Sequence, residues 1–350
     1  MLQRVGLRCD GGPSIGVGHV VRCLALGDEL RARGAEVSLI GDLGGLGWLE
    51  RQVAARGISV IAAPDEPEAL AEVVVGLGLE AVVLDVYQLD PRAGELIRAR
   101  GVMVLAISDG PFGAGQDADV ALDQNLGAAV GVGRHGTFLA GLDYALFRDQ
   151  ILEQRRQPTD GAPRRRSPLR VLAVFGGTDA HAAAPVVVPM LLATGLPVEV
   201  VAVAAHPEIA QRLRVLEMGA GQSIEVVPPV DDLAVLAITC DLAVTASGSS
   251  VWEFFCLGLP AALVCVTENQ VVGYDAVTAA GAAIGIGSLS ALRTDPVQRS
   301  AGVRALTDLV TNPRLRAALA NRGQELIDGR GRQRVVDVLE SQQRPGKIDH

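Results

Sequence analysis

Aromatic side chains are scarce in this chain: Phe, Trp and Tyr together make up 3% of its 350 residues. Its cores must therefore be packed from Ala, Val and Leu. A hydrophobic share of 49%, against 20% charged residues, is ample for that purpose. The length predicts two domains of ordinary size.

Positive charge is also in short supply. Lys and Arg number 31 against 40 Asp and Glu, so the net charge is −9, which argues against nucleic acid or an anionic membrane as the main partner. No apolar run reaches membrane-spanning length, because Gly, Pro or charged residues interrupt each one, so we expect no stable membrane insertion. Residues 1–4 lead straight into the first strand and leave no room for a signal peptide, which predicts a cytoplasmic protein.

Cysteine is sparse, and its spacing is not that of a metal site. The five residues lie within apolar stretches: Cys9, Cys23, Cys240, Cys256 and Cys265. We interpret them as small buried hydrophobic side chains in a reducing compartment. We therefore predict neither a metal site nor a bound cofactor.

The most informative stretch is the glycine-rich turn at residues 11–22. A short apolar strand at residues 5–9 precedes it, and a helical pattern starts near His19. Gly16 and Gly18 let backbone N–H groups approach an anion, and the helix start adds its positive end. That positive end, together with Arg22 one turn on, is expected to keep the His19 ring uncharged, the form that a general base needs. The residues alone leave both a base and a simple helix cap open for His19, and many loop histidines only cap a helix.

The first half of the chain alternates strands with helices. The strands are expected at residues 37–40, 58–62, 81–84 and 102–107, and their apolar character on both faces predicts a parallel sheet covered by helices. Ligands of such sheets bind beyond the carboxyl ends of the strands. Polar residues at these ends are therefore candidates, although each is equally a turn former or cap: Asp10, Asp42, Asp85, Tyr87, Asp109 and Asp123.

A Pro- and Arg-rich segment separates the two halves. It predicts an N-terminal domain at residues 1–148, a linker at 149–168, a C-terminal domain at 169–340 and a flexible tail at 341–350. Strands are expected in the second half at residues 169–175, 198–203, 223–227, 242–245, 260–266 and 282–285.

Two turns of the second half can hold phosphate. One is built by Gly176, Gly177 and Thr178, and the other contains Ser249 and Ser250. Glu253 follows on the first helical turn, where it is either the partner of Ser250 in a capping box or a carboxylate that binds both ribose hydroxyls. The amides of Asn269 and Gln270 suit sugar hydroxyls, or cap the next helix.

In a series of short segments, the chain resembles the UDP-sugar hydrolases of pseudaminic acid biosynthesis and the related spore-coat polysaccharide proteins. It more distantly resembles the peptidoglycan glycosyltransferase that adds N-acetylglucosamine to lipid-linked muramyl-pentapeptide. The pieces cover most of the chain in order: residues 8–10, 15–24, 85–87, 123–125, 139–148, 175–179, 246–253, 257–260, 268–270 and 328–331. Val86 stands where the hydrolase motif has a histidine between its aspartate and its tyrosine.

The resemblance implies a glycosyltransferase B-type (GT-B) fold, with two doubly wound, Rossmann-like domains that face each other across a cleft. It implies that His19 activates water and that Tyr87 acts beside it, with Gly16, Gly18, Arg22 and Asp85 near the substrate. In the C-terminal domain it implies nucleotide binding, with Glu253 on the ribose and with Gly176, Gly177, Thr178, Ser249 and Ser250 near the diphosphate. Asn269 and Gln270 would contact the substrate.

The function expected from this resemblance is hydrolysis of a UDP-linked 2,4-diacetamido-2,4,6-trideoxyhexose. Water would attack the anomeric carbon with inversion and release UDP, in nonulosonic acid or surface polysaccharide biosynthesis. The nearest alternative is a UDP-sugar-dependent glycosyltransferase of the same fold, and a third is a non-catalytic nucleotide-sugar-binding protein. The expected partner is the UDP-sugar alone, bound by a monomer.

Overall fold

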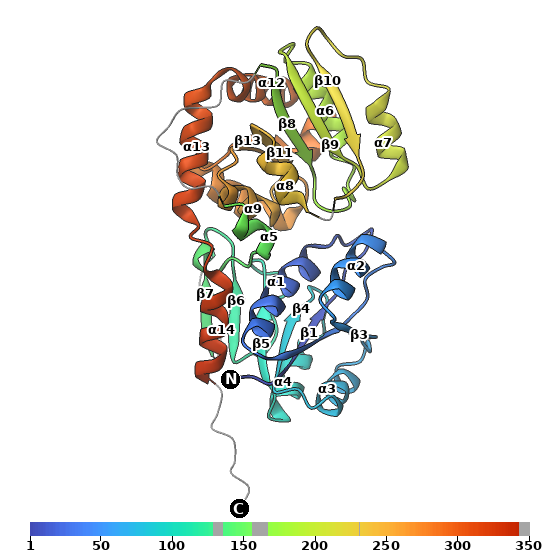
Figure 1. Ribbon diagram of the computed structural model, residues 1–350, viewed down its shortest axis with the longest axis vertical. Helices are drawn as coiled ribbons and strands as arrows, with labels where there is room; N and C mark the ends of the chain where they lie inside the picture. The colour runs from blue at the N-terminus through green and yellow to red at the C-terminus, as the bar shows by residue number, and fades with distance from the viewer. Residues whose placement is uncertain (129–135, 156–166, 231, 343–350) are drawn as a thin grey trace, which may run out of the picture. The chain divides into compact units, whose positions relative to one another are not determined.

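The computed structural model describes residues 1–128, 136–155, 167–230 and 232–342. The chain divides into two compact units. The first comprises Met1–Gly11, His19–Arg148 and the chain from Gly329 onward, and the second comprises Gly12–Gly18 and Asp149–Asp328. Each unit is built on one parallel sheet, as the strand and helix alternation predicts (Figure 1).

The first unit contains a seven-stranded sheet in the order β3-β2-β1-β4-β5-β6-β7, in which all neighbours are parallel. The strands are β1 (Arg4–Cys9), β2 (Glu36–Ile40), β3 (Ser59–Ile61), β4 (Ala81–Asp85), β5 (Met103–Ile107), β6 (Val120–Asp123) and β7 (Thr137–Ala140). β6 and β7 are absent from the strands expected from the sequence. β6 is fully buried but offers only three apolar residues before Asp123, and the four residues of β7 are only partly buried apart from Leu139, so neither has the longer apolar run that marks the central strands.

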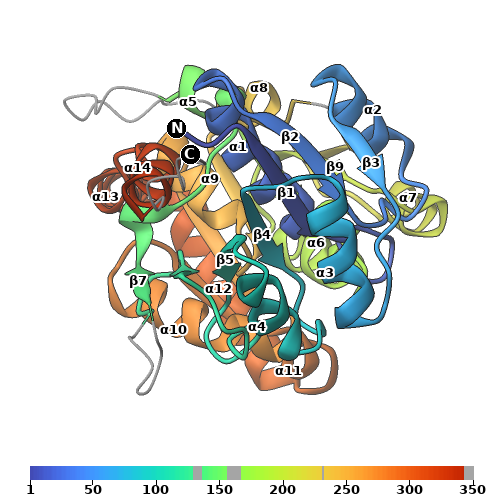
Figure 2. The same ribbon diagram turned by 90° about the horizontal axis from the view of Figure 1, so that it is seen from below.

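Helices cover both faces of this sheet. Figure 2 shows α1 on one side of the central strands and α3 and α4 on the other. The side-chain contacts agree: α1 packs Gly27 toward Leu7 and Val37, whereas Ile40 and Leu84 lie in the cluster under α3 and α4. The helical segments are α1 (Gly18–Ala32), α2 (Gly47–Ala55), α3 (Pro67–Gly76), α4 (Arg92–Ala99) and η1 (Leu142–Tyr144).

The second unit contains a six-stranded parallel sheet in the order β10-β9-β8-β11-β12-β13. The strands are β8 (Leu169–Val174), β9 (Val198–Val203), β10 (Ser223–Val227), β11 (Leu242–Ala246), β12 (Ala261–Cys265) and β13 (Ile284–Ser288). The helices are α5 (Asp149–Glu153), α6 (Ala184–Leu192), α7 (Pro207–Arg214), α8 (Leu233–Ile238), α9 (Ser250–Leu257), η2 (Glu268–Gln270), α10 (Val271–Ala279), α11 (Leu289–Thr294), α12 (Pro296–Thr311) and α13 (Pro313–Leu326).

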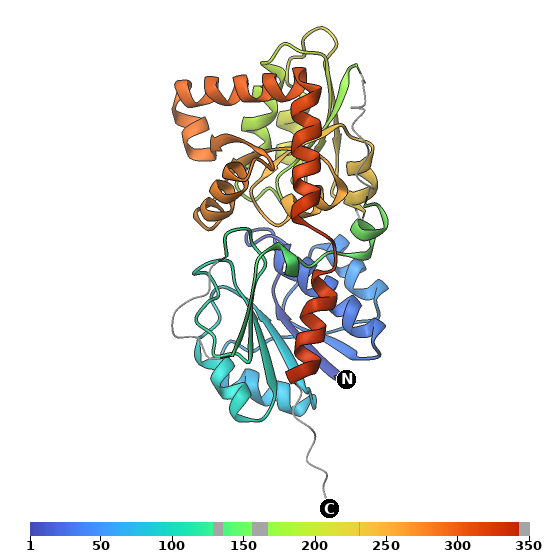
Figure 3. The same ribbon diagram turned by 90° about the vertical axis from the view of Figure 1, so that its left-hand side faces the viewer.

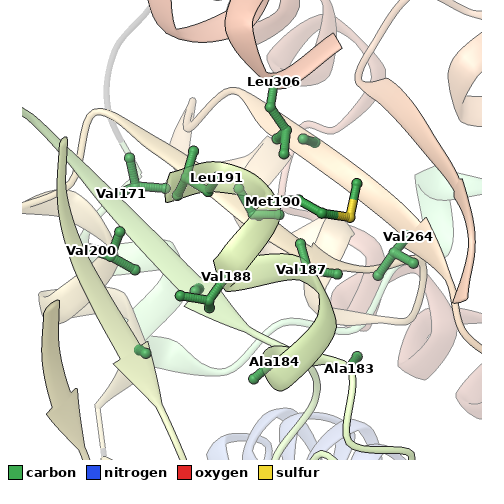
Figure 4. Packing of buried hydrophobic residues seen from close by; sticks show 14 of the residues in the cluster. Val171, Ala183, Ala184, Val187, Val188, Met190, Leu191, Val200, Val264 and Leu306 are labelled. Atoms are coloured by element: carbon green, nitrogen blue, oxygen red, sulfur yellow. The ribbon is translucent and has the colours of Figure 1, made fainter. Parts of the chain in front are cut away.

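The core of the second unit is aliphatic. Figure 4 shows Val187, Val188 and Leu191 of α6 gathered with the strand residues Val171 and Val200. Each of these side chains is at most 1% exposed. Full burial of a Val or Leu side chain stabilises a fold by about 1.5–3 kcal/mol, so a core with few aromatic rings is sufficient, as the composition suggests.

The last helix, α14 (Gly331–Gln342), differs from the expected domain boundaries. The sequence places residues up to 340 in the C-terminal domain, but α14 packs on the first unit (Figure 3). Its Val335, Val336 and Leu339 are fully buried, and Arg33, which follows α1, donates hydrogen bonds to the Asp337 and Glu340 carboxylates of α14. At its start, Gly331 lies so close to the backbone of Ala145 that a side chain would collide with it.

The expected linker is also partly regular. Its first residues form α5 and belong to the second unit, while residues 156–166 lie outside the described residues, as does the expected tail after residue 342.

Candidate active site

Both sheets reverse their strand order at one point. In the first unit this point lies between β1 and β4, and in the second between β8 and β11. Doubly wound sheets bind ligands outside the carboxyl ends of the strands at such a reversal. The turns singled out in the sequence follow β1, β8 and β11, so they lie at these two points.

The turn after β1 is held by its own backbone. Gly12 and Gly16 exchange two N–H to O bonds of 2.9 Å. Gly16 has φ +82°, a left-handed conformation that strongly favours glycine. Helix α1 then begins at Gly18, so His19 lies in its first turn with 15% of its side chain exposed.

The centre of the site is the carboxylate of Asp85, the last residue of β4, which is 0% exposed. Its Oδ1 lies 2.7 Å from Nδ1 of His19 and 2.6 Å from Nη2 of Arg22, while its Oδ2 lies 2.6 Å from Nε of Arg22. Cys23 Sγ approaches Oδ2 at 3.6 Å. Burial raises the pKa of Asp85, but the charge of Arg22 and the His19 bond outweigh it and hold this pKa well below its usual range.

This arrangement fixes the hydrogen on the His19 ring. An ionised carboxylate only accepts hydrogen bonds, so Nδ1 of His19 must donate to Asp85. The neutral ring then carries its lone pair on Nε2, where it can take a proton. This is the tautomer that a carboxylate imposes on a catalytic histidine in hydrolase triads. From the sequence, only the helix end and Arg22 were expected to act on the His19 ring, and the bond to Asp85 was not foreseen.

A second carboxylate, Asp109, lies just after β5 with 13% of its side chain exposed. Arg22 Nη1 donates to both of its oxygens at 3.0 Å, Tyr87 donates its hydroxyl to Oδ2, and Asn125 Nδ2 donates to Oδ1 at 2.7 Å. Burial raises the pKa of Asp109, but Arg22 and the Tyr87 hydroxyl outweigh it and lower this pKa below its ordinary value. The Tyr87 ring packs edge-on against His19, with centroids 4.5 Å apart.

The strand-end residues thus separate into two groups. Asp85 and Asp109 both bond Arg22, Tyr87 bonds Asp109, and Asp123 joins this cluster through Asn125, because β4, β5 and β6 are neighbours in the sheet. Asp10 and Asp42 instead stabilise turns, since Asp42 N–H donates to Asp10 and Gly44 N–H to Asp42. Asp109 was one of the strand-end candidates, although no role was predicted for it. Asn125 was not among the predicted site residues, and its place two residues after the end of β6 was the available signal.

In the second unit, a carboxylate from the turn after β8 occupies the N-terminal end of the next helix, α6. Asp179, with φ +47°, accepts N–H bonds from Ala183 at 2.7 Å and Ala184 at 3.0 Å, next to the first residues of α6. Burial raises the pKa of Asp179 to about 6, although these backbone bonds lower it. Its carboxylate therefore takes the place of an external anion at α6, and only the turn of Gly176, Gly177 and Thr178 remains for a phosphate.

The turn after β11 is different. Helix α9 begins at Ser250, and Ser249 at its N-cap makes no side-chain cap bond. The capping-box alternative for Ser250 and Glu253 fails because Ser250 is already helical. Glu253 lies one turn into the helix and is 8% exposed. Gly248 faces the amide of Gln270, which a Cβ on Gly248 would contact at 3.7 Å.

Asn269 and Gln270 lie in η2, after β12. Gln270 Oε1 accepts the N–H of Val266 at 3.0 Å, and Thr267 Oγ1 lies 2.6 Å from Asn269 Oδ1. Gln270 is thereby held near the Ser249 turn, whereas Asn269 is tied to its own loop.

Among the residues that the structure describes, no three His, Cys, Asp or Glu side chains are grouped to hold a metal ion. The five cysteines are buried and free. Over the same residues, no helix is both long and apolar enough to cross a membrane.

Comparison with known proteins shows the fold. No protein-family model matches the chain. It is 23% identical to the spore coat polysaccharide biosynthesis protein SpsG of Bacillus subtilis strain 168, over 97% of this chain and 98% of that protein. Among solved structures it is similar to MurG of Acinetobacter baumannii, with a TM-score of 0.69 at 18% identity, over 97% of this chain and 99% of that one.

Two ligand complexes have the same fold. The MnaA–UDP co-structure from S. aureus matches with a TM-score of 0.67 at 12% identity, over 97% of this chain and 96% of that one. The spinosyn rhamnosyltransferase SpnG complexed with thymidine diphosphate matches with a TM-score of 0.62 at 17% identity, over 97% and 100%. The expected GT-B fold, with two Rossmann-like domains, is confirmed.

Proposed function

We propose that this protein transfers a glycosyl group from a nucleotide sugar to an acceptor hydroxyl, as a GT-B glycosyltransferase. The observation that carries the proposal is the His19–Asp85 pair, which leaves the Nε2 lone pair of the ring available as a base. The likeness to a polysaccharide biosynthesis protein and to a rhamnosyltransferase complexed with a nucleoside diphosphate supports it.

In the proposed step, the acceptor hydroxyl gives its proton to Nε2 of His19 as its oxygen attacks the anomeric carbon. The bond between that carbon and the diphosphate breaks, and the nucleoside diphosphate leaves with the electron pair. Attack from the opposite side inverts the anomeric centre. Asp85 stabilises the imidazolium that forms, and a well-placed base of this kind accelerates a reaction by about 10²–10⁴-fold.

The nucleotide is assigned to the second unit. Ser249 and Ser250 offer hydroxyls and N–H groups to the diphosphate at the start of α9, where no side-chain cap bond competes for them. Glu253 is proposed to accept both ribose hydroxyls. Gly176, Gly177 and Thr178 would support the diphosphate from the neighbouring strand end, and Asn269 and Gln270 the sugar.

Binding of the nucleotide is tested with S249A. Loss of a hydrogen bond to a charged group costs about 1.5–3 kcal/mol, so the Kd for UDP measured by calorimetry should rise about 10- to 100-fold. S300A is the control, because Ser300 is exposed on α12 and bonds only to its own helix in the contacts seen. An unchanged Kd in S249A would remove this turn from the nucleotide site.

Hydrolysis is the second candidate, with water in place of the acceptor. The motif resemblance around Gly16, His19, Asp85 and Tyr87 favours it, and the substrate would be a UDP-linked 2,4-diacetamido-2,4,6-trideoxyhexose. Val86 is the departure from that motif, and it lies beside the carboxylate that holds the base.

One experiment separates the two candidates. The purified protein is incubated with UDP- and dTDP-sugars, including diacetamido-trideoxyhexoses, with and without a panel of sugar acceptors, and the products are identified by NMR. Release of free sugar and nucleoside diphosphate without acceptor supports hydrolysis, and acceptor-dependent release supports transfer. Nucleotide binding without any turnover would favour a non-catalytic binding protein. Sedimentation of the same sample tests the predicted monomer.

A further inference from the structure

Asp109 is not assigned a part in the proposed reaction, yet it is joined to His19 by two separate routes of contacts. It follows β5, whereas Asp85 ends β4 and His19 lies on α1. One chain of contacts ends at Nδ1 of His19, through Asp85, and the other ends at the His19 ring, through the ring of Tyr87.

The first route runs through Arg22. Nη1 of the guanidinium donates to both oxygens of Asp109 at 3.0 Å, and its Nε and Nη2 donate to Asp85 at 2.6 Å. A guanidinium is a planar, rigid fork. The position of Asp109 therefore fixes the plane of Arg22, and Arg22 in turn fixes the carboxylate that holds His19.

The second route runs through Tyr87. Its hydroxyl donates to Oδ2 of Asp109, and its ring meets the His19 ring edge-on, at 83° between planes. Asp109 thus sets the position of the ring that packs against His19. Asn125, itself bonded to Asp123 at 2.9 Å, holds the other oxygen of Asp109.

The charge balance of this cluster indicates a function for Asp109. Asp85 alone would neutralise Arg22, which is 5% exposed, so the fold needs no second carboxylate there. Removing another carboxylate from water costs free energy, and a buried ion pair is weak evidence for added stability. We infer that Asp109 is a positioning residue, which holds the His19–Asp85 pair in place through Arg22 and Tyr87 together.

The test uses Asp109→Asn, which keeps the shape and removes the charge. The matched control is Asp28→Asn. Asp28 has 11% of its side chain exposed and pairs with Arg56 through two nitrogens, at 2.9 Å and 3.0 Å. It lies on α1 nine residues after His19, about 14 Å along the helix. Both variants lose one carboxylate–arginine pair of similar burial.

The first readout is the proton NMR signal of His19 Nδ1–H in the protein without substrate. Its bond to Asp85 shifts this signal downfield and slows its exchange with water. In D109N we expect the signal to move or broaden, and in D28N to stay as in the wild type. Unchanged signals in both variants, with equal losses of stability, would overturn the inference and leave Asp109 a structural residue.

The second readout rests on the proposed function. With a nucleotide sugar that the wild type turns over, D109N should lower kcat about 10- to 100-fold and leave the Kd for UDP unchanged. Wild-type kcat in D109N would also overturn the inference. If no tested sugar is turned over by the wild type, the proposed function fails, and the NMR signal still decides the role of Asp109.

Discussion

Replacing Asp85 by Asn tests how the base is held. Asp85 presents Oδ1 to His19 and Arg22 and Oδ2 to Arg22 again, so all three of these contacts are with donors. An amide has one oxygen and one NH2 group. Whichever way it turns, its NH2 group faces at least one of these donors.

The magnitude follows from these contacts. Removing one partner of a buried ion pair typically costs 3–5 kcal/mol, and we expect about 3 kcal/mol because Arg22 keeps Asp109. That is smaller than the usual stability of a domain, so D85N should fold. Its activity should fall by about 10⁴-fold, because the ring loses the carboxylate that fixes its tautomer.

The assay pairs urea unfolding with release of nucleoside diphosphate, and D28N again serves as the control. A folded D85N that retains more than about a tenth of the wild-type kcat would refute the reasoning, since a fixed tautomer would then be unnecessary. A D85N variant that is less stable but as active as the wild type would also show that a fixed tautomer of His19 is unnecessary.

Two further predictions concern other parts of the fold. The raised pKa of Asp179, about 6 against an ordinary 3.8, means that the folded state binds this proton more tightly than the unfolded state. The stabilisation is present below pH 4 and is lost as the pH rises past 6. The free energy of unfolding of the wild type relative to D179N should therefore fall by about 2 kcal/mol between pH 4 and 7. Urea titrations that show no such slope would contradict this prediction. On α14, L339A should lower the free energy of unfolding in urea by about 2–5 kcal/mol, because Leu339 is fully buried. V297A on α12 should change this free energy little, because Val297 is 73% exposed. Equal effects of the two variants would show that α14 is not part of the core.

The fold was predictable because its central strands are buried on both faces. Strands such as residues 81–85 and 242–246 are buried throughout and are apolar apart from Asp85 and Thr245, and they alternate with helices. β7 lacks such a run. The position of α14 was not predictable, because an amphipathic helix shows that one face is buried but not which unit covers it.

The sequence could predict which residues are candidates for the site, but not which of them bond to one another. The strand-end rule selected Asp85 and Asp109 together with Asp10 and Asp42. Only the strand order shows that the first two share Arg22. Likewise, α9 begins at Ser250 with Ser249 as its N-cap, one residue earlier than a capping box between Ser250 and Glu253 requires. Spacing alone cannot locate the start of a helix to one residue.

The central claim is that His19 is the base and takes no part in holding the nucleotide. It is tested most directly by measuring kcat and the Kd for UDP of His19→Ala beside the wild type. The account predicts a kcat lower by about 10²–10⁴-fold with an unchanged Kd. A fully active variant, or one whose defect lies entirely in UDP binding, would contradict it.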